Sequence, residues 1–214
     1  MSNYQKQDFW SLKAQKERYP ARSVYKLQEL DKKFGLLPKN SAQMNENYKI
    51  LELGAAPGSW SLYILRKLSG RGFLAACDLA PLSRRFDEGL FDGQNFLFKQ
   101  SDIFAPDTKN EFAAAGPFNL ILSDAAPSTS GGRLVDAARS TELAEAAILY
   151  AHSTLKKGGG LCVKIFQGSQ TASLIKEARL FFASLKTFKP EACRPASFET
   201  YIIGSGWRAR RTEL

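Results

Sequence analysis

The chain has 214 residues, enough for one full α/β domain and too few for two comfortable ones. Its hydrophobic content of 44% is ordinary for a globular protein, no apolar run approaches the roughly 20 residues that span a bilayer, and the polar start lacks the apolar core of a signal peptide. A net charge of +9 favours a polyanionic partner such as a nucleic acid, the alternative being a solvated basic surface.

The first 40 residues form a basic segment, with nine Lys or Arg against four acids up to Lys39. Within it, residues 22–34 place Val24, Leu27, Leu30 and Phe34 on one stripe, which predicts a helix that ends at Gly35. Lys26 lies beside this stripe, at the edge of the face that meets the core. We expect residues 1–40 to pack on a single globular domain formed by residues 41–214.

Strand and helix patterns then alternate along the chain. Alternation of this kind indicates βαβ units and a doubly wound, mostly parallel sheet. The last apolar run, residues 199–204, follows residues 186–189 after only a loop, which predicts an antiparallel terminal pair. The preceding elements are strands at 49–53, 72–77, 95–98, 118–123 and 160–165, with helices at 58–68, 136–156 and 171–184.

A glycine turn follows the first strand, in the stretch from Ile50 to Trp60. A strand that runs through Gly54, Pro57 and Gly58 into an amphipathic helix brings its carboxyl end to a helix N-terminus, where nucleotide-type ligands bind in open α/β sheets. The spacing is Gly-x-x-x-Gly, and a pyrophosphate-binding turn needs Gly-x-Gly-x-x-Gly. The turn therefore favours an adenosine cofactor without a pyrophosphate, of which S-adenosylmethionine is the common one.

Three aspartates follow predicted strands. Asp78 is placed to accept both ribose hydroxyls of an adenosine, the alternative being a cap for the next turn. Asp102 could accept from an adenine amino group or simply cap its strand end. Asp124 comes directly after a buried apolar strand and before Ala-Ala-Pro, which indicates a carboxylate held rigidly at the cleft, although a turn-forming aspartate would give the same pattern.

Two charged residues near the C-terminal strands are also unusual. Lys164 lies near the end of an apolar strand, where burial of an ammonium is costly unless an acid pairs with it or it reaches solvent. Glu199 opens the last strand and could be an ordinary edge residue. The single His152 lies inside a predicted helix, and three scattered cysteines (Cys77, Cys162 and Cys193) contain no Cys-x-x-Cys pair. We therefore expect reduced thiols, a cytoplasmic protein and no metal.

Six ordered blocks between residues 22 and 203 make the chain resemble the FtsJ-type RNA ribose 2′-O-methyltransferases. One departure is Ser59, where the bacterial rRNA enzymes of this family usually carry a second glycine. The blocks are Arg22-Ser-Val-Tyr-Lys-Leu, Leu53-Gly-Ala-Ala-Pro-Gly-Ser-Trp-Ser, Cys77-Asp-Leu-Ala-Pro, Ser123-Asp-Ala-Ala-Pro, Val163-Lys-Ile-Phe-Gln-Gly and Ser197-Phe-Glu-Thr-Tyr-Ile-Ile.

The resemblance implies a Rossmann-like class I methyltransferase fold and S-adenosylmethionine as cofactor. It places the family's catalytic Lys-Asp-Lys-Glu set on Lys26, Asp124, Lys164 and Glu199. The cofactor positions that we expect are the turn residues Gly54 and Pro57 together with Gly58, Trp60, Asp78, Asp102 and Asp124.

We predict that Lys164 removes the proton of a ribose 2′-hydroxyl and that Lys26 favours this step and stabilises the oxyanion. Asp124 and Glu199 would orient the two ammonium groups. The compact single domain makes a uridine of 23S rRNA in the large ribosomal subunit the first choice of substrate, and tRNA the second. We expect a monomer that binds no membrane. The rival interpretations are a non-catalytic RNA-binding relative, which would not need all four residues, and a small-molecule methyltransferase, which would gain little from basic termini.

Overall fold

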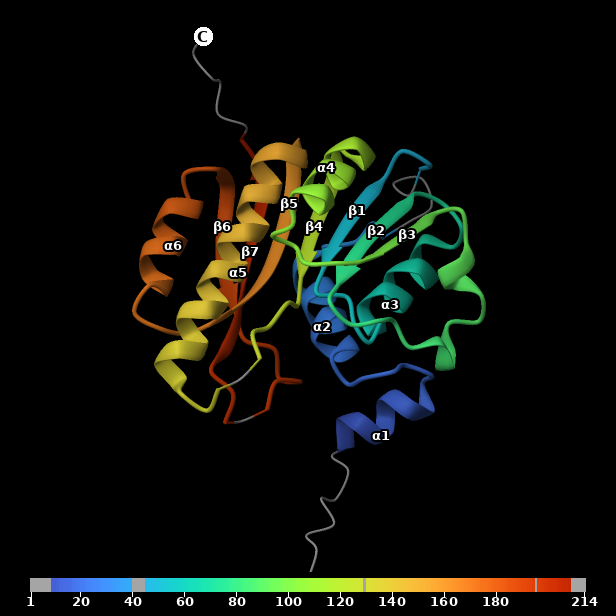
Figure 1. Ribbon diagram of the computed structural model, residues 1–214, viewed down its shortest axis with the longest axis horizontal. Helices are drawn as coiled ribbons and strands as arrows, with labels where there is room; N and C mark the ends of the chain where they lie inside the picture. The colour runs from blue at the N-terminus through green and yellow to red at the C-terminus, as the bar shows by residue number, and fades with distance from the viewer. Residues whose placement is uncertain (1–8, 40–44, 129, 195, 209–214) are drawn as a thin grey trace, which may run out of the picture.

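The structure is a computed structural model that describes residues 9–39, 45–128, 130–194 and 196–208. In these ranges seven strands form one sheet in the order β3-β2-β1-β4-β5-β7-β6, with helices on both faces (Figure 1). The strands are β1 (Lys49–Leu53), β2 (Phe73–Asp78), β3 (Phe96–Gln100), β4 (Phe118–Ser123), β5 (Leu155–Phe166), β6 (Phe182–Phe188) and β7 (Glu199–Trp207).

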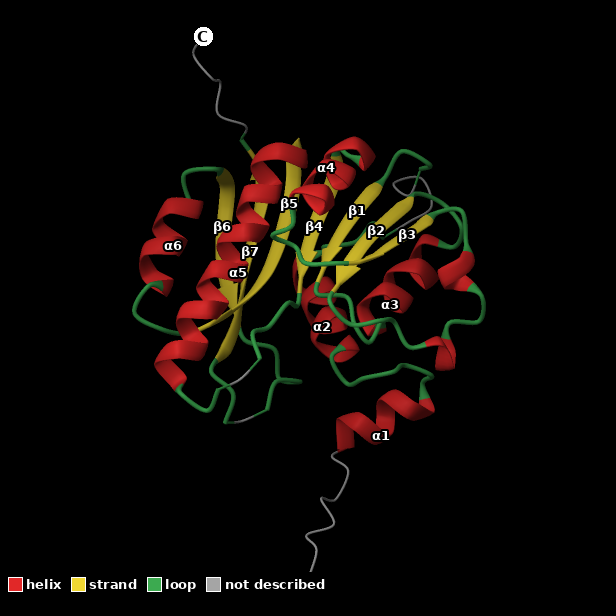
Figure 2. Ribbon diagram, in the orientation of Figure 1, coloured by secondary structure: helices red, strands yellow, loops and turns green. Residues whose placement is uncertain are grey.

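Helices cover the sheet in two layers (Figure 2). The first three pack through one apolar cluster and the last three through another. Helices α2 (Val24–Phe34) and α3 (Ser59–Leu68) lie on one face, and α4 (Pro106–Ala115), α5 (Arg133–Thr154) and α6 (Thr171–Ala178) lie on the other. Helix α1 (Phe9–Lys16) lies beyond the ends of the strands and joins the first cluster through Trp10 and Ala14.

The sheet is parallel except for one strand. The pairs of β1 with β2 and β4, of β2 with β3, and of β4 with β5 are all parallel. Strand β7 runs antiparallel to both β5 and β6. The predicted α/β doubly wound sheet with an antiparallel C-terminal strand is therefore confirmed. Because β1 and β4 are adjacent, their carboxyl ends and the loops that follow them meet at one edge of the sheet.

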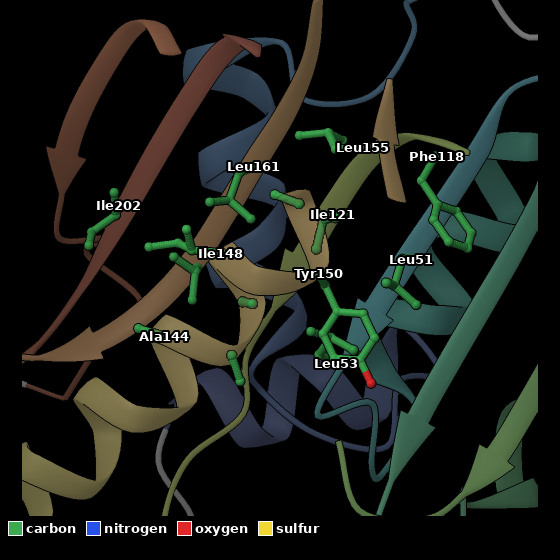
Figure 3. Packing of buried hydrophobic residues seen from close by; sticks show 14 of the residues in the cluster. Leu51, Leu53, Phe118, Ile121, Ala144, Ile148, Tyr150, Leu155, Leu161 and Ile202 are labelled. Carbon is green, nitrogen blue, oxygen red and sulfur yellow. The ribbon is translucent and has the colours of Figure 1, made fainter. Parts of the chain in front are cut away.

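Period-two alternation within the strands divides the core between the two faces. In β5, Leu161, Val163 and Ile165 pack toward α5, in the cluster that Figure 3 shows around Ile148 and Tyr150. Lys164 has the opposite parity and therefore points to the face that α2 covers. The same rule places Glu199 and Tyr201 of β7 on the α2 face, where Tyr201 joins the first cluster.

The structure differs from the sequence prediction most clearly at α6, α4 and α1, and β5 begins at Leu155, five residues earlier than predicted. The helix expected over 171–184 ends at Ala178, and β6 begins at Phe182. The run Leu180-Phe-Phe-Ala-Ser-Leu is apolar enough to fit either periodicity, and pairing of β6 with β7 decides for a strand. Helix α4 was not predicted, although Pro106 at its first turn and Gly116 just after it are ordinary boundary signals. Helix α1 was also not predicted.

The N-terminal segment packs against the rest of the molecule through α2. Val24, Leu27 and Leu30 are fully buried in the same cluster as residues of α3 and β1. The predicted boundary between the basic N-terminal segment and the globular domain, after residue 40, lies outside the described residues. Three basic residues near the termini, Lys6, Arg210 and Arg211, also lie outside them. Within the ranges that the structure covers, no helix is long and apolar enough to cross a bilayer.

Candidate active site

A cavity of about 510 Å³ opens at the carboxyl edge of the sheet. Its walls come from the start of α2, the turn after β1, the end of β2, the loop after β4, the end of β5, and the loop that leads into β7 together with the start of that strand. Four of the predicted residues that carry charge line it together, namely Lys26, Asp124, Lys164 and Glu199.

Lys164 and Asp124 form a buried ion pair at the end of β5. The Lys164 Nζ lies 3.0 Å from the Asp124 Oδ1 and also donates to the main-chain carbonyl oxygen of Asp124. The side chain of Lys164 is only 6% exposed. Two of the ammonium's donors are thus fixed by one residue, and the third position on nitrogen remains for a ligand in the cavity.

Lys26 and Glu199 form the second pair, which joins α2 to β7 across 173 residues of sequence. The Lys26 Nζ lies 2.9 Å from both carboxylate oxygens of Glu199, in a contact that leaves 13% of the lysine side chain exposed. Lys164 of β5 pairs with Tyr201 of β7, and Phe166 of β5 pairs with Glu199. Lys164 and Glu199 therefore lie two positions apart along adjacent strands.

Tyr201 connects the ion pairs to the core. Its hydroxyl donates to the Asp124 Oδ1 at 2.7 Å, and its ring stacks on Trp60 with centroids 6.0 Å apart. The Trp60 indole Nε1 in turn donates to the main-chain oxygen of Ser23, at the start of α2. This chain of contacts fixes the Asp124 carboxylate relative to the helix that carries Lys26.

Opposite charges determine the ionisation of this cluster. Burial raises the pKa of Asp124, but the ammonium groups of Lys164 and Lys26 and the hydrogen bond from Tyr201 outweigh burial and lower it below its ordinary value. Burial lowers the pKa of Lys26, but the carboxylates of Asp124 and Glu199 outweigh it and raise the pKa above its ordinary value. Asp124 is therefore a carboxylate and Lys26 an ammonium at neutral pH.

The turn after β1 forms the other side of the cavity. Gly54 N donates to the Cys77 carbonyl at 2.9 Å, and the Asp78 carboxylate accepts from Ala56 N and Ala80 N, both at 2.9 Å. A carboxylate has about four acceptor positions, so two remain for ligand hydroxyls. Asp78 and Gly54 also line a smaller cavity of about 100 Å³, which contains Asp102.

Gly54 is required at its position for two separable reasons. Its φ of +78° is unfavourable for other residues, and an added Cβ would lie 2.4 Å from Ala125 Cα. Gly70 has a φ of +77° with open space around it, so it is a matched control. We expect Gly70→Ala to cost about 1–2 kcal/mol of unfolding free energy and Gly54→Ala about 1–3 kcal/mol more, measured by urea denaturation. Equal losses would contradict the steric argument.

The predicted cofactor residues divide into two groups. Gly54, Pro57, Asp78 and Asp124 line the larger cavity, and Asp102 lines the smaller one, where its Oδ1 also accepts from Phe104 N at 2.9 Å. Gly58 and Trp60 line neither cavity. The Trp60 ring is buried in the core and supports the site through Ser23 and Tyr201. Ser59, the departure from the family pattern, is buried, and its hydroxyl accepts from Ala21 N at 2.8 Å.

Tyr201 and Glu52 are among the residues at or beneath the site that were not singled out from the sequence. Tyr201 lies two positions after Glu199, so strand alternation could have placed it beside the ion pairs. Glu52 lies in the middle of apolar strand β1, two positions before Gly54, and is fully buried. Ser61 Oγ donates to its Oε2 at 2.7 Å, and its Oε1 has no hydrogen-bond partner among the described residues. Burial raises the pKa of Glu52 to about 8.

The described residues contain no group of three or more His, Cys, Asp or Glu side chains placed to hold a metal ion. Cys77, Cys162 and Cys193 are free and buried. The charged lining of the larger cavity consists of the two lysine–carboxylate pairs together with Asp78, Arg22 and Arg194.

The chain is similar to named proteins over most of its length. The chain is 45% identical to "Ribosomal RNA large subunit methyltransferase E" of Treponema denticola, over 95% of this chain and 96% of the relative. It is 41% identical to the Nitratidesulfovibrio vulgaris protein of the same name, over 94% of each chain.

Two solved structures are also similar. The first is a Plasmodium falciparum protein described as a ribosomal RNA methyltransferase, with a TM-score of 0.72 and 26% identity over 90% of this chain and all of that one. Aeropyrum pernix fibrillarin, solved with natively bound S-adenosyl-L-methionine, has a TM-score of 0.58 at 18% identity, over 85% of this chain and 76% of its own, and shares the fold. The family model for the FtsJ-like methyltransferases matches residues 19–207, and the chain belongs to that family.

Proposed function

We propose that the chain is an S-adenosylmethionine-dependent RNA ribose 2′-O-methyltransferase that modifies a uridine of 23S rRNA in the cytoplasm, acting as a monomer. The observation that carries the proposal is the pair of lysine–carboxylate contacts, Lys164 with Asp124 and Lys26 with Glu199, beside the glycine turn. The net charge of +9 suits a polyanionic substrate. The names of the relatives at 41–45% identity support large-subunit rRNA over tRNA.

The turn and its neighbours fit the cofactor. A Cβ at Gly54 would collide with the backbone of Ala125, and both residues line the two cavities, which also share Asp78. Asp78 would accept from the ribose hydroxyls, Asp102 from the adenine amino group, and Asp124 would face the methionine end. When bound, S-adenosylmethionine supplies an electrophilic methyl group on its sulfonium.

The four charged residues would perform the proton transfer and orient the substrate. A ribose 2′-hydroxyl is a weak nucleophile at neutral pH, so a positioned base must take its proton. Lys164 Nζ is assigned this role because Asp124 fixes two of its positions and leaves the third toward the cavity. Lys26 remains an ammonium, since its pKa is raised by Asp124 and Glu199, and it would stabilise the developing oxyanion.

The role of Asp78 is tested by Asp78→Asn. Hydrogen bonds to a charged acceptor contribute about 1.5–3 kcal/mol, so we expect S-adenosylmethionine to bind about 10- to 100-fold more weakly. RNA affinity should stay within about twofold. The measurement is isothermal titration with the cofactor, and Asp107→Asn, an exposed carboxylate in the first turn of α4, is the matched control. An unchanged cofactor affinity in Asp78→Asn would remove Asp78 from the cofactor site.

The proposed function is tested by transfer of a labelled methyl group to large ribosomal subunits, to purified 23S rRNA and to tRNA, followed by mapping of the modified ribose. We expect incorporation at a single 2′-oxygen of 23S rRNA. Incorporation into tRNA alone would overturn the rRNA assignment. If purified protein with bound cofactor modified none of the three, the RNA methyltransferase proposal would be wrong.

A further inference from the structure

A second cavity, of about 550 Å³, lies at the opposite edge of the sheet from the candidate active site. It is bounded by the C-terminal end of α2, the start of β5, and β6 and β7. It shares no lining residue with the cavity that contains Lys26 and Lys164. We call it the amino-edge pocket and define it by its four lysines, Lys33, Lys156, Lys157 and Lys186.

The amino-edge pocket is lined by positive charges and by no negative ones. None of the residues that line it is acidic, and within the described part of the chain its lysines form no ion pair. Lys156 Nζ donates to two neutral oxygens, Asn47 O and Asn119 Oδ1, both at 3.2 Å, and Lys33 Nζ lies 3.8 Å from the centre of the Phe188 ring. Lys33, Lys157 and Lys186 are exposed. Like charges held together in a concave site favour an anion.

The backbone of β5 builds this pocket through a break in strand pairing. Phe118 of β4 pairs with Leu155, but Leu120 pairs with Gly160, so β5 has extra residues over this stretch. The extra residues of β5 include Lys156 and Lys157, which line the pocket. Gly158, with a φ of +81°, turns the chain, and a Cβ on Gly159 would come within 2.8 Å of Leu155. Bulges of this kind commonly re-aim side chains at functional sites.

We propose that the amino-edge pocket binds backbone phosphates of the RNA substrate, an inference that rests on the proposed function. Lys26 and Lys33 are seven residues apart on α2, which puts them on the same helix face and about 10 Å apart along its axis. Phosphates along one strand of B-form DNA are spaced about 3.4 Å apart along the helix axis, and those of an RNA strand are spaced on the same scale. An RNA strand whose reacting ribose lies at Lys26 therefore reaches the pocket within a few nucleotides, and lysines bind phosphate as mobile point charges.

The test is a triple variant, Lys33→Gln, Lys157→Gln and Lys186→Gln, which keeps Lys156 because of its hydrogen bonds to Asn47 and Asn119. The matched control removes the same charge from exposed positions on or beside α4 and α6, with Lys109→Gln, Lys176→Gln and Arg179→Gln.

Dissociation constants for transcribed 23S rRNA are measured across a salt series. The logarithm of the association constant falls linearly with the logarithm of the salt concentration. We expect this line to be less steep in the pocket variant, with the magnitude of its slope smaller by about 1–2, and the affinity at low salt to be about 10-fold weaker. The control should match the wild type, and the cofactor affinity of both variants should be unchanged.

Two results would overturn the proposal: a wild-type slope in the pocket variant, or an equal loss in the control. A second arm titrates inorganic phosphate and follows the amide signals of residues 158–160. If phosphate shifts these signals while the pocket variant keeps its RNA affinity, the pocket holds a free anion and the RNA assignment is wrong. This experiment measures RNA binding and not methyl transfer. A less steep salt dependence would therefore support the amino-edge pocket even if the methyltransferase proposal failed, so failure of one proposal can be distinguished from failure of the other.

Discussion

Replacement of Lys164 by arginine is expected to lower the single-turnover rate of methyl transfer by about 10²–10⁴-fold, the usual contribution of a positioned base. Arginine keeps the positive charge opposite Asp124, so the buried ion pair is retained. A guanidinium cannot be deprotonated in a protein, and it therefore cannot take the proton of the 2′-hydroxyl. The measurement is quenched-flow transfer of a labelled methyl group at saturating RNA and cofactor.

Lys164→Arg is compared with Lys176→Arg, an exposed lysine on α6, and with Lys164→Met. The methionine variant removes both the charge and the base and leaves Asp124 with Tyr201 and Lys26. Cofactor affinity and thermal melting show whether each variant is folded. If Lys164→Arg is folded and transfers methyl groups at the wild-type rate, Lys164 acts through its charge and the base lies elsewhere.

The positions of Asp124 and Lys164 could be predicted from the sequence because both lie at the ends of apolar strands. Parallel strands of one sheet bring their carboxyl ends together, so a charged residue at each end is enough to place them near each other. The strand register then explains why Lys164 faces α2, since its neighbours Val163 and Ile165 point the other way.

The contact between Lys26 and Glu199 could not be derived from local patterns. It joins residues 173 positions apart, and its geometry depends on how α2 lies across the end of β7. Only the family resemblance placed these two residues in one site. Tyr201 was not predicted as a site residue, because an aromatic residue in an apolar strand is typical of the core. Strand alternation places it on the same face as Glu199, but its hydrogen bond to Asp124 is known only from the structure.

The segment from Thr171 to Phe188 shows the limit of periodicity. Its apolar positions fit a helix as far as residue 184, yet α6 ends at Ala178. The strand that follows is selected by pairing with β7, which the local sequence does not encode. The predicted helix is too long because long-range strand pairing overrides the local helical propensity of these residues.

Substitution of Glu52 by glutamine is expected to change how stability depends on pH. The pKa of Glu52 is raised to about 8 by burial, against about 4.3 in an unfolded chain. Between these values the folded protein holds a proton that the unfolded protein has released. The free energy of unfolding therefore falls as pH rises through this window and levels off above it. Glutamine does not ionise, so this contribution is absent from the variant.

The measurement is a series of urea unfolding curves from pH 5 to pH 9 for the cofactor-free wild type, Glu52→Gln and the exposed control Glu142→Gln. Relative to Glu52→Gln, the wild type should lose on the order of 3–5 kcal/mol across this range, and Glu142→Gln should follow the wild type. Parallel curves for wild type and Glu52→Gln would mean that Glu52 is already ionised in the folded protein.

A protonated Glu52 also has a consequence for the site. Asp124 and Asp78 both raise the pKa of Glu52 through charge repulsion. A neutral Glu52 avoids a third negative charge beneath the turn, so Asp124 can remain ionised beside Lys164 and Lys26. As pH rises toward 8, ionisation of Glu52 would oppose the charge on Asp124. The Glu52→Gln variant should therefore hold its cofactor affinity between pH 7 and pH 9 more constant than the wild type does.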